Sequence, residues 1–335
     1  MKEGFDSPWD RQTNIMYNIG VIDKINYKGI ELLEKNNNFS YEIITDLSKD
    51  NLLKKLPLFD GVTLRRGKLD EDLLKVATKL KVISRHGVGY DNVDVNYLKN
   101  NDIKLLVTNS SGSTSPAEHI MFSILSIYKG ISMFDELVRS GNFQKAINLE
   151  INKNFELFNK EILIVGFGRI GKKLIKKCLG FDLKVKIFDP FVNKELIESL
   201  GGTKIDNLNE GLKNCDILSL SLPLNEKTKN LISLKEMKLM KKSSIIINAS
   251  RGGIVNETDL DNALKNKIIF FAGIDVFEEE PPKKDNPLIS NKRVLLSPHA
   301  ATFTKECLEN MSIETVSNII NFFEKKIDKS KFVSL

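Results

Sequence analysis

The sequence predicts an α/β fold built from two doubly wound parallel sheets. Short apolar stretches of strand length alternate with helical patterns along most of the chain, and a glycine-rich turn lies between the two parts of this alternation. Such alternation favours parallel sheets with helices on both faces, because each crossover helix brings the chain back to the same edge of the sheet. With 335 residues, the chain is long enough for two domains of ordinary size.

The first part of the alternation runs from Ile19 to about Asn109. Helical patterns such as Leu69–Leu80 separate its apolar stretches. The candidate strands are Ile19–Ile22, Tyr41–Ile44, Gly61–Leu64, Lys81–Ser84 and Lys104–Thr108. This part has no GxGxxG motif of its own, so we expect a smaller α/β unit without a nucleotide signature.

A helix start follows at Ser115-Pro116-Ala117-Glu118. Ser115 is predicted to be the N-cap, Pro116 suits the first helical position, and Glu118 would complete a capping box. His119 lies next to the apolar stripe of this helix. We interpret it as a structural histidine, because no partner motif points to it.

The stretch Lys160–Asp189 has the order of a dinucleotide-binding unit: strand, glycine turn, helix, strand and acid. Gly166 permits the tight turn, and Gly168 leaves room for the backbone to approach a pyrophosphate. Gly171 lets the helix pack closely on the strand. The helix N-terminus offers N–H groups and a partial positive charge to the phosphates. This order predicts a Rossmann-like domain, and the strand–helix alternation of the first part predicts a second one. The alternative for Lys160–Asp189 is a glycine turn in another kind of α/β protein.

Asp189 follows the second strand of this unit. An acid near this position accepts hydrogen bonds from the adenosine ribose and repels a 2′-phosphate. The sequence therefore favours NAD over NADP as the cofactor.

Further strands are expected after Asp189, at Asp216–Leu220, Ser244–Asn248, Ile269–Asp275 and Val294–Ser297. In doubly wound sheets, ligands bind at the carboxyl ends of the strands. Those ends carry Asp189, Pro223, Asn248–Arg251, Asp275 and His299. Lys305–Lys325 predicts a long helix that returns to the first domain.

A histidine and two charged groups are candidates for the chemistry. Glu280 lies 19 residues before His299, and a carboxylate beside a histidine fixes its tautomer and stabilises its protonated form. That combination suits a proton donor at neutral pH. Arg251 follows a strand, and its planar guanidinium can hold a carboxylate through two hydrogen bonds. A solvated acidic loop around Glu280 and a surface arginine are the alternatives.

The composition excludes several classes of partner. The net charge is +6, but the 50 basic and 44 acidic residues are interspersed, which does not indicate a nucleic-acid footprint. Three separated cysteines show neither metal-ligand spacing nor an even disulfide set, which favours a reducing compartment. Residues 1–20 lack the apolar core of a signal peptide, and no apolar run reaches the ~20 residues of a membrane helix. We expect a cytoplasmic protein without a metal, nucleic-acid or membrane partner.

Six motifs follow one another along the chain: Arg85–Asp94, Ser115–Glu118, Gly166–Gly171, Asn248–Val255, Asp275–Pro282 and Pro298–Ala300. In their order and spacing they resemble those of the D-isomer-specific 2-hydroxyacid dehydrogenases. Within that family they look closest to the D-3-phosphoglycerate dehydrogenases, and the resemblance covers about Ile19 to Phe323.

This resemblance implies roles for individual residues. His299 would be the general acid, paired with Glu280, and Arg251 would hold the carboxylate and keto oxygen of the substrate. Substrate contacts are also implied for Arg65 and for the backbone of Gly87, Val88 and Gly89. The implied cofactor contacts are Gly166, Gly168, Arg169, Ile170, Gly171, Asp189, Leu222, Pro223, Ala249, Ser250, Arg251, Asp275 and His299, with Asp275 at the nicotinamide carboxamide.

Two residues concern the identity of the substrate that the resemblance implies. Arg65 matches an arginine that lies near the substrate in phosphoglycerate enzymes, where it could meet a phosphate or pair with an acid. His86 replaces a small residue that is common in those enzymes.

The resemblance implies an NAD-dependent oxidoreductase that interconverts a D-2-hydroxy acid and its 2-oxo acid by hydride transfer. A phosphoglycerate dehydrogenase-like enzyme is expected. A glyoxylate/hydroxypyruvate reductase, or a dehydrogenase for another small 2-hydroxy acid, is the alternative. A rival of another class is an NAD-sensing corepressor that binds peptides. Formate dehydrogenases typically pair their histidine with glutamine, whereas this chain offers Glu280.

The same resemblance implies a discontinuous substrate-binding domain of residues 1–110 and 299–335. The NAD-binding domain would be residues 111–298, with the active site in the cleft between the two. Family members are commonly dimers through their nucleotide domains, so a homodimer is expected.

Overall fold

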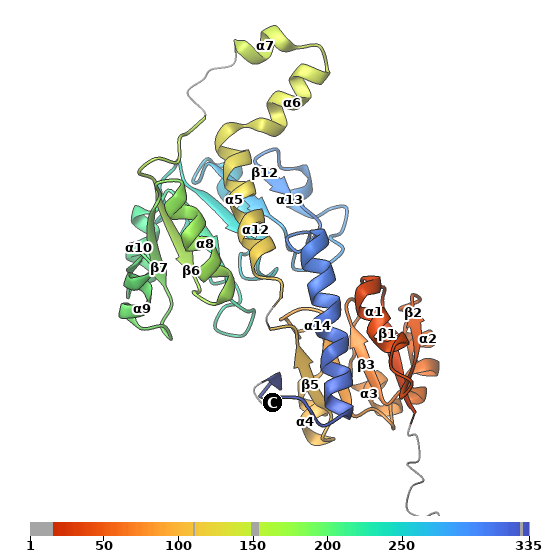
Figure 1. The fold of residues 1–335 in the computed structure, drawn as a ribbon. Coiled ribbons are helices and arrows are strands. Elements are labelled where there is room, and N and C mark those ends of the chain that lie inside the picture. Colours follow the sequence, from red (N-terminus) through yellow and green to blue (C-terminus); the bar gives the residue numbers. More distant parts are fainter. Residues whose placement is uncertain (1–15, 110, 149–153, 329–330, 335) are drawn as a thin grey trace, which may run out of the picture. The chain divides into compact units, whose positions relative to one another are not determined.

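The computed structural model describes residues 16–109, 111–148, 154–328 and 331–334. This part of the chain divides into two compact units (Figure 1). One unit contains the described residues up to Gly112 together with those from Thr304 on, and the other is Ser113–Phe303. The second boundary falls at 303/304, whereas the sequence prediction places it at 298/299, so His299 lies in the second unit.

The first unit contains a five-stranded parallel sheet in the order β2-β1-β3-β4-β5. All of its predicted strands are confirmed to within one or two residues at each end. They are β1 (Tyr17–Ile22), β2 (Phe39–Ile44), β3 (Gly61–Leu64), β4 (Val82–Arg85) and β5 (Lys104–Val107). The connecting helices are α1 (Tyr27–Glu34), α2 (Lys49–Lys55), the 3-10 helix Leu56–Leu58, α3 (Glu71–Val76) and α4 (Val95–Asn100).

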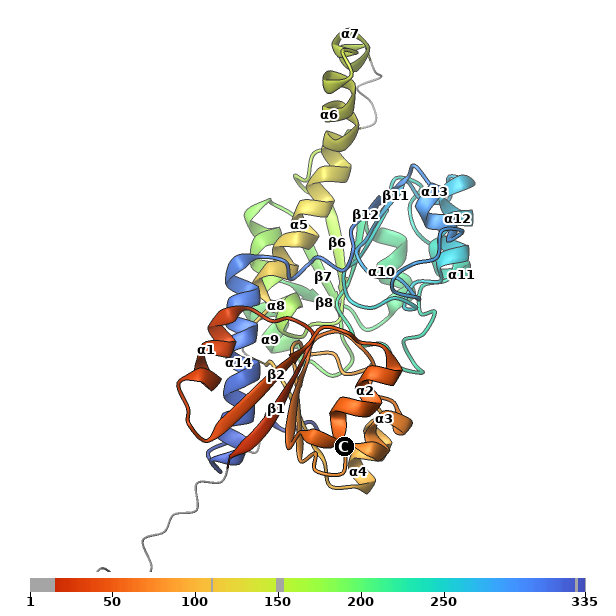
Figure 2. The ribbon, with the colours of Figure 1, turned by 90° about the vertical axis from the view of Figure 1, so that its right-hand side faces the viewer.

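Helix α14 (Lys305–Phe323) completes the first unit, as the sequence predicts. Figure 2 shows α1 and α14 on one side of the sheet and α2, α3 and α4 on the other. Val316 and Ile319 of α14 pack in one cluster with Ile19 of β1. Gly29 allows α1 to approach closely, because a Cβ there would lie 2.5 Å from the carbonyl oxygen of Ser312. Both faces of the sheet are therefore buried, which explains its continuous apolar strands.

The second unit contains a seven-stranded parallel sheet in the order β12-β11-β10-β9-β6-β7-β8. The order reverses between β6 and β9, as in a doubly wound sheet. The strands are β6 (Glu161–Val165), β7 (Lys184–Phe188), β8 (Thr203–Lys204), β9 (Ile217–Leu220), β10 (Ile245–Asn248), β11 (Phe271–Ile274) and β12 (Val294–Leu296). Its helices include α5 (Thr114–Lys129), α8 (Arg169–Gly180), α9 (Lys194–Ser199), α10 (Leu208–Asn214), α11 (Leu234–Met237), α12 (Glu257–Lys265) and α13 (Pro287–Ser290). The predicted fold of two doubly wound α/β units is confirmed.

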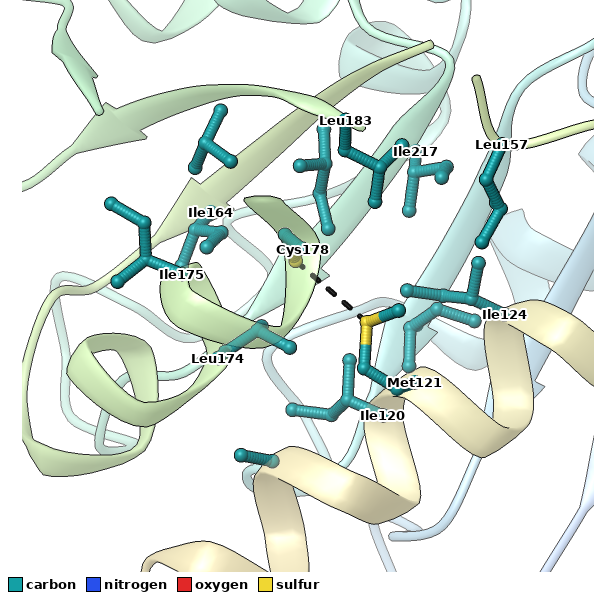
Figure 3. Close-up of a cluster of buried hydrophobic side chains, with 14 of the residues drawn as sticks. Ile120, Met121, Ile124, Leu157, Ile164, Leu174, Ile175, Cys178, Leu183 and Ile217 are labelled. Atoms are coloured by element: carbon teal, nitrogen blue, oxygen red, sulfur yellow. Dashed lines mark hydrogen bonds between the residues drawn. The ribbon is translucent and has the colours of Figure 1, made fainter. Parts of the chain in front are cut away.

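Helices α5 and α8 cover one face of this sheet through a buried apolar cluster (Figure 3). Met121 and Ile124 of α5 meet Leu174 and Cys178 of α8, and the sulfur atoms of Cys178 and Met121 are 3.7 Å apart. Burial raises the pKa of the Cys178 thiol to about 12, so this cysteine is a neutral, space-filling group. All three cysteines are free and buried.

The start of α5 differs from the prediction. The helix begins at Thr114, so Ser113 occupies the N-cap position and the predicted capping box at Ser115 and Glu118 is wrong. Each of those two side chains has a partner outside the helix: Ser115 Oγ donates to the carbonyl oxygen of Ala301 at 2.6 Å, and Glu118 pairs with Lys177 at 2.9 Å. Tertiary contacts have taken precedence over the local capping rule.

Two helices, α6 (Ile131–Arg139) and α7 (Phe143–Ile147), extend from the end of α5 and project from the second unit (Figures 1 and 2). Neither helix buries a residue of its own. Their exposed apolar side chains are Ile131, Met133, Val138, Phe143 and Ile147. We call this segment the α6–α7 arm; no pattern described above predicts it.

Candidate active site

The glycine turn after β6 has the shape that a pyrophosphate requires. Gly166 has a φ of +92°, and a Cβ there would lie 2.4 Å from the carbonyl oxygen of Ser221. A Cβ at Gly171 would lie 2.8 Å from the carbonyl oxygen of Gly166. Gly168 is different, since the space where its Cβ would lie has no described atom within 4 Å. Side chains would clash at the first and third glycines, whereas the second faces open space.

Helix α8 begins directly after Gly168, so its N-terminus faces this open space. Gly168 is its N-cap residue and provides no side-chain cap. Arg169 and Ile170 are the first residues of the helix. Uncapped N–H groups and the helix dipole form an anion-binding site, so this turn fits the phosphates of a dinucleotide.

Asp189 lies directly after the end of β7 and is tied to the glycine turn. Its Oδ2 accepts a hydrogen bond from the N–H of Phe167 at 2.7 Å, and its Oδ1 accepts one from the N–H of Phe191 at 2.9 Å. Each carboxylate oxygen has a further lone pair for a ribose hydroxyl. The residues of the turn and the acid beside it fit NAD, because the fixed carboxylate opposes a 2′-phosphate.

The remaining predicted cofactor residues follow the neighbouring strands β9 and β10. Leu222 lies against the glycine turn, since a Cβ at Gly166 would be 3.2 Å from the Cβ of Leu222. Pro223 comes next, and its carbonyl oxygen accepts from Thr228 Oγ1. After β10, Ser250 donates its N–H and Oγ–H to Asn248 Oδ1, which fixes the turn at Ala249. These residues lie at the carboxyl ends of the strands, where the sequence predicts them.

Asp275, directly after β11, organises a loop of residues Ser297–Ala301, which we call the histidine loop. The carboxylate is only 2% exposed. Oδ1 accepts from Ser297 Oγ at 2.6 Å and from the N–H of Ala300 at 2.8 Å, and Oδ2 accepts from the N–H of Ala301 at 3.0 Å. The carbonyl oxygen of Asp275 accepts from the N–H of His299 at 2.7 Å. The histidine loop is therefore wrapped around one buried carboxylate.

His299, in the middle of this loop, has a φ of +53°. A left-handed backbone conformation costs a residue other than glycine roughly 1–2 kcal/mol, so the hydrogen bonds of Asp275 must hold it. His299 Nδ1 is 2.7 Å from Glu280 Oε2, and the predicted pairing of the two residues is present in the structure. With Nδ1 engaged, Nε2 is the nitrogen that can exchange a proton with a ligand.

Glu280 is oriented from its other side as well, because its Oε1 accepts from the N–H of Phe277 at 3.1 Å. Burial alone would raise the pKa of Glu280. The hydrogen bond and charge of His299, the Phe277 N–H and the charge of Arg251 outweigh burial and hold that pKa below its ordinary value. Glu280 is therefore a carboxylate at neutral pH and contacts Nδ1 of the His299 imidazole.

Arg251 follows β10, and its positive charge contributes to the lowered pKa of Glu280. Its Nη1 donates to the carbonyl oxygen of Ser250 at 2.6 Å, and its own carbonyl oxygen accepts from Asn248 Nδ2. A Cβ at Gly252 would lie 1.8 Å from the carbonyl oxygen of Phe277, so the backbone after Arg251 runs directly against the Glu280 segment. The second unit thus brings together Arg251, Glu280 and His299.

The predicted substrate residues of the first unit follow β3 and β4. Arg65 Nη1 donates to the carbonyl oxygen of Lys24 at 2.9 Å and lies 3.7 Å from Asp23 Oδ2. Of the two alternatives for Arg65, the acid pairing is present. The N–H of Gly87 donates to the carbonyl oxygen of Arg85, while Val88 is exposed. Gly89 follows at the same loop, partly buried.

His86 is buried, with Nε2 3.1 Å from Ser312 Oγ on α14. That hydroxyl donates to the carbonyl oxygen of Leu308 and accepts from the N–H of Asn26, so Nε2 of His86 carries the hydrogen. Burial, followed by the charges of Arg65 and Arg85, lowers the pKa of His86 to about 4. This histidine is neutral at physiological pH.

His119 is the site residue whose partners the sequence analysis missed. Its Nε2 lies 3.1 Å from Ser297 Oγ in the histidine loop and 3.6 Å from Asp275 Oδ1. The signal in the sequence is its spacing of four from Ser115, which places both polar side chains on one helix face.

Within the described residues, no group of three or more histidine, cysteine, aspartate or glutamate side chains could hold a metal ion. In the same part of the chain, no helix has the length and apolar character needed to cross a bilayer.

The strand order and the open glycine turn define a dinucleotide-binding protein. Residues 121–301 match the family model described as "D-isomer specific 2-hydroxyacid dehydrogenase, NAD binding domain". The chain belongs to the D-isomer-specific 2-hydroxyacid dehydrogenase family, and the family predicted from its motifs is confirmed.

Three relatives illustrate the range of the similarity. A D-3-phosphoglycerate dehydrogenase of Methanocaldococcus jannaschii is 34% identical over 94% of this chain, which spans 62% of the relative's length. A glyoxylate reductase of Thermococcus litoralis is 37% identical over 89% of this chain and 91% of its own. The crystal structure of the TT0316 protein from Thermus thermophilus superposes with a TM-score of 0.86, 25% identity and coverage of 95% of this chain and 100% of its own.

Proposed function

We propose that this protein is an NAD-dependent dehydrogenase that interconverts a D-2-hydroxy acid and its 2-oxo acid. The carrying observation is the 2.7 Å contact between His299 Nδ1 and Glu280 in the unit that contains the glycine turn. Arg251 beside this pair adds the cation that a carboxylate substrate requires.

The roles proposed for the residues follow from their contacts. NAD(H), when bound, supplies or accepts the hydride. Gly168, Arg169 and Ile170 hold its pyrophosphate and Asp189 its ribose. The pyrophosphate is fixed by backbone N–H groups, which do not depend on a side-chain rotamer.

His299 donates a proton from Nε2 to the keto oxygen of the substrate during reduction, and Glu280 stabilises the protonated imidazole before transfer. Arg251 holds the carboxylate bidentately and stabilises negative charge on the reacting oxygen. Gly87, Val88, Gly89 and Arg65 contribute further substrate contacts. On this view Ser113–Phe303 is the NAD-binding domain and the other unit binds the substrate.

D-3-phosphoglycerate is the proposed substrate, supported by the Methanocaldococcus relative named for it. Glyoxylate or hydroxypyruvate is the second candidate, because the Thermococcus glyoxylate reductase is more similar in sequence and matches over nearly its whole length. Arg65 and Arg66 share the single carboxylate of Asp23, at 3.7 and 2.5 Å, so the two arginines keep a net positive charge that suits the phosphorylated acid.

NADH oxidation with 3-phosphohydroxypyruvate, hydroxypyruvate, glyoxylate, pyruvate and bulkier 2-oxo acids tests this proposal. NADPH run in parallel tests the role of Asp189, and we expect a strong preference for NADH. A preference for the phosphorylated acid selects phosphoglycerate, and a preference for an unphosphorylated acid selects the second candidate. Absence of turnover with every acid would contradict the enzymatic proposal and favour an NAD-sensing binder.

A homodimer is also proposed, with the α6–α7 arm of each copy covered by the other. Phe143 and Ile147 of α7 are each more than half exposed, which is unusual for apolar side chains that share one short helix. A groove of about 540 Å³ between α5 and α8 exposes further apolar groups, including Phe122 and Phe181, beside Lys176 and Lys177. A two-fold dimer would cover both surfaces in each copy.

Light scattering after size exclusion measures the oligomeric state. We expect a dimer for the wild type and a monomer for Phe143→Asp. Lys145→Asp, which changes the charge of the same helix at a polar position, is the matched control and should remain dimeric. A monomeric wild type would refute this interface.

The free, buried cysteines support a proposed cytoplasmic location, because nothing in their environment requires an oxidising compartment.

A further inference from the structure

Helix α5 presents two polar side chains to the histidine loop, one near each end of it. Ser115 Oγ donates to the carbonyl oxygen of Ala301 at 2.6 Å, and His119 Nε2 lies 3.1 Å from Ser297 Oγ. Residues four apart in a helix share a face, so the two side chains act together on one loop. His299 lies between the two anchored ends.

The direction of the hydrogen bonds is determined by Ser297. Its hydroxyl hydrogen is donated to Asp275 Oδ1 at 2.6 Å, so toward His119 the hydroxyl oxygen can only accept. His119 is therefore the donor, with the hydrogen on Nε2. The same nitrogen is 3.6 Å from Asp275 Oδ1. His119 thus holds Ser297, which in turn donates to this buried carboxylate.

The carboxylate of Asp275 is the link from this shell to His299. Asp275 binds the N–H groups of Ala300 and Ala301, and its carbonyl oxygen binds the N–H of His299 itself. A left-handed residue persists only where its surroundings over-determine its conformation. Small displacements of a reacting group reduce rates strongly, so the anchoring of this loop bears on the chemistry.

We propose that His119 is a positioning residue for the reaction, acting through Ser297 and Asp275 on the backbone of His299. This inference depends on the proposed role of His299 as the proton donor. In this role His119 acts through the histidine loop and not on the substrate itself.

The test compares His119→Leu with His119→Gln. Leucine fills a similar volume without a donor, whereas glutamine keeps an N–H that can reach Ser297. We expect kcat of His119→Leu to fall about tenfold with an unchanged KM for the 2-oxo acid, as misplacement of the proton donor predicts. His119→Gln should recover most of kcat. Ser123→Ala is the matched control, because the Ser123 hydroxyl donates to the carbonyl oxygen of His119 within the same helix and does not contact the histidine loop among the described residues.

Hydrogen exchange of the peptide containing residues 297–301, measured without cofactor or substrate, gives a readout that does not depend on activity. Exchange should be faster in His119→Leu than in wild type, and close to wild type in His119→Gln and Ser123→Ala. Unchanged exchange in His119→Leu would overturn the proposal, and so would faster exchange with unchanged turnover. If wild type turned over no 2-oxo acid, the proposed function would fail while the exchange data still decided whether His119 holds the loop.

Discussion

His86 and His299 each follow the carboxyl end of a parallel strand, one in each unit, and the structure gives them opposite properties. His86 is 5% exposed, faces a serine hydroxyl and has arginines nearby. The His299 side chain is 46% exposed and contacts the carboxylate of Glu280. The first environment keeps the imidazole neutral, whereas the second gives the imidazole a carboxylate partner and access to solvent. The partner and the exposure of a histidine, rather than its place after a strand, therefore decide whether it can work as an acid.

The largest expected effect is on turnover. His299→Ala should lower kcat about 1000-fold, within the range that general acid catalysis contributes. NADH should still bind, since the glycine turn is unaffected. Steady-state kinetics and NADH fluorescence titration measure the two quantities.

His86→Asn is the contrasting variant, and its kcat should stay within a few-fold of wild type. If His86→Asn lost as much turnover as His299→Ala, the distinction between the two histidines would be refuted.

The next effect is on acid stability and concerns His86. Its pKa is about 4 in the folded protein, compared with 6.5 for an ordinary histidine. Below pH 6.5 the unfolded chain binds a proton that the folded chain does not, so stability falls as the pH falls from 6.5 toward 4. The shift corresponds to a loss of about 3 kcal/mol at pH 4.

Thermal unfolding between pH 7 and pH 4 measures this loss, with His86→Asn as the comparison. The wild type should lose more stability than the variant over this range. Parallel curves for the two proteins would contradict the buried, neutral state of His86.

The smallest effect concerns Glu280, the carboxylate that distinguishes the environment of His299 from that of His86. Glu280→Gln keeps the hydrogen-bonding shape but removes the charge, and kcat should fall about tenfold to a hundredfold. Because the folded pKa of Glu280 is below its ordinary value of 4.5, wild-type pairing is present above that value and is lost as the pH falls through the folded pKa.

Steady-state kinetics of Glu280→Gln at neutral pH measure this loss. A kcat equal to that of wild type would show that the Glu280 carboxylate does not support proton transfer by His299.

The strands and the glycine turn could be predicted because their requirements are local. A buried parallel strand needs a continuous apolar run, and Gly166 and Gly171 are required by clashes with nearby backbone. His299 and Glu280 were predictable for a related reason, since they follow the neighbouring parallel strands β12 and β11, whose carboxyl ends lie at the same edge of the sheet.

Other features depend on contacts between distant parts of the sequence. His119 meets Ser297 across a separation of 178 residues, and His86 meets Ser312 across 226. No pattern around His86 indicates that α14 will bury it. Ser115 shows the opposite error: the local sequence predicted a cap, but a carbonyl group 186 residues away binds the side chain instead.

The discontinuity of the first unit has a consequence for synthesis on the ribosome. Strands β1–β5 emerge first, but the face that Ile19 and Val82 present stays uncovered until Val316 and Ile319 of α14 have been translated. The second unit, Ser113–Phe303, is continuous in the chain and can fold before that point. The first unit can therefore complete its core only after the second unit has been translated, and until then one apolar face of its sheet stays exposed to solvent.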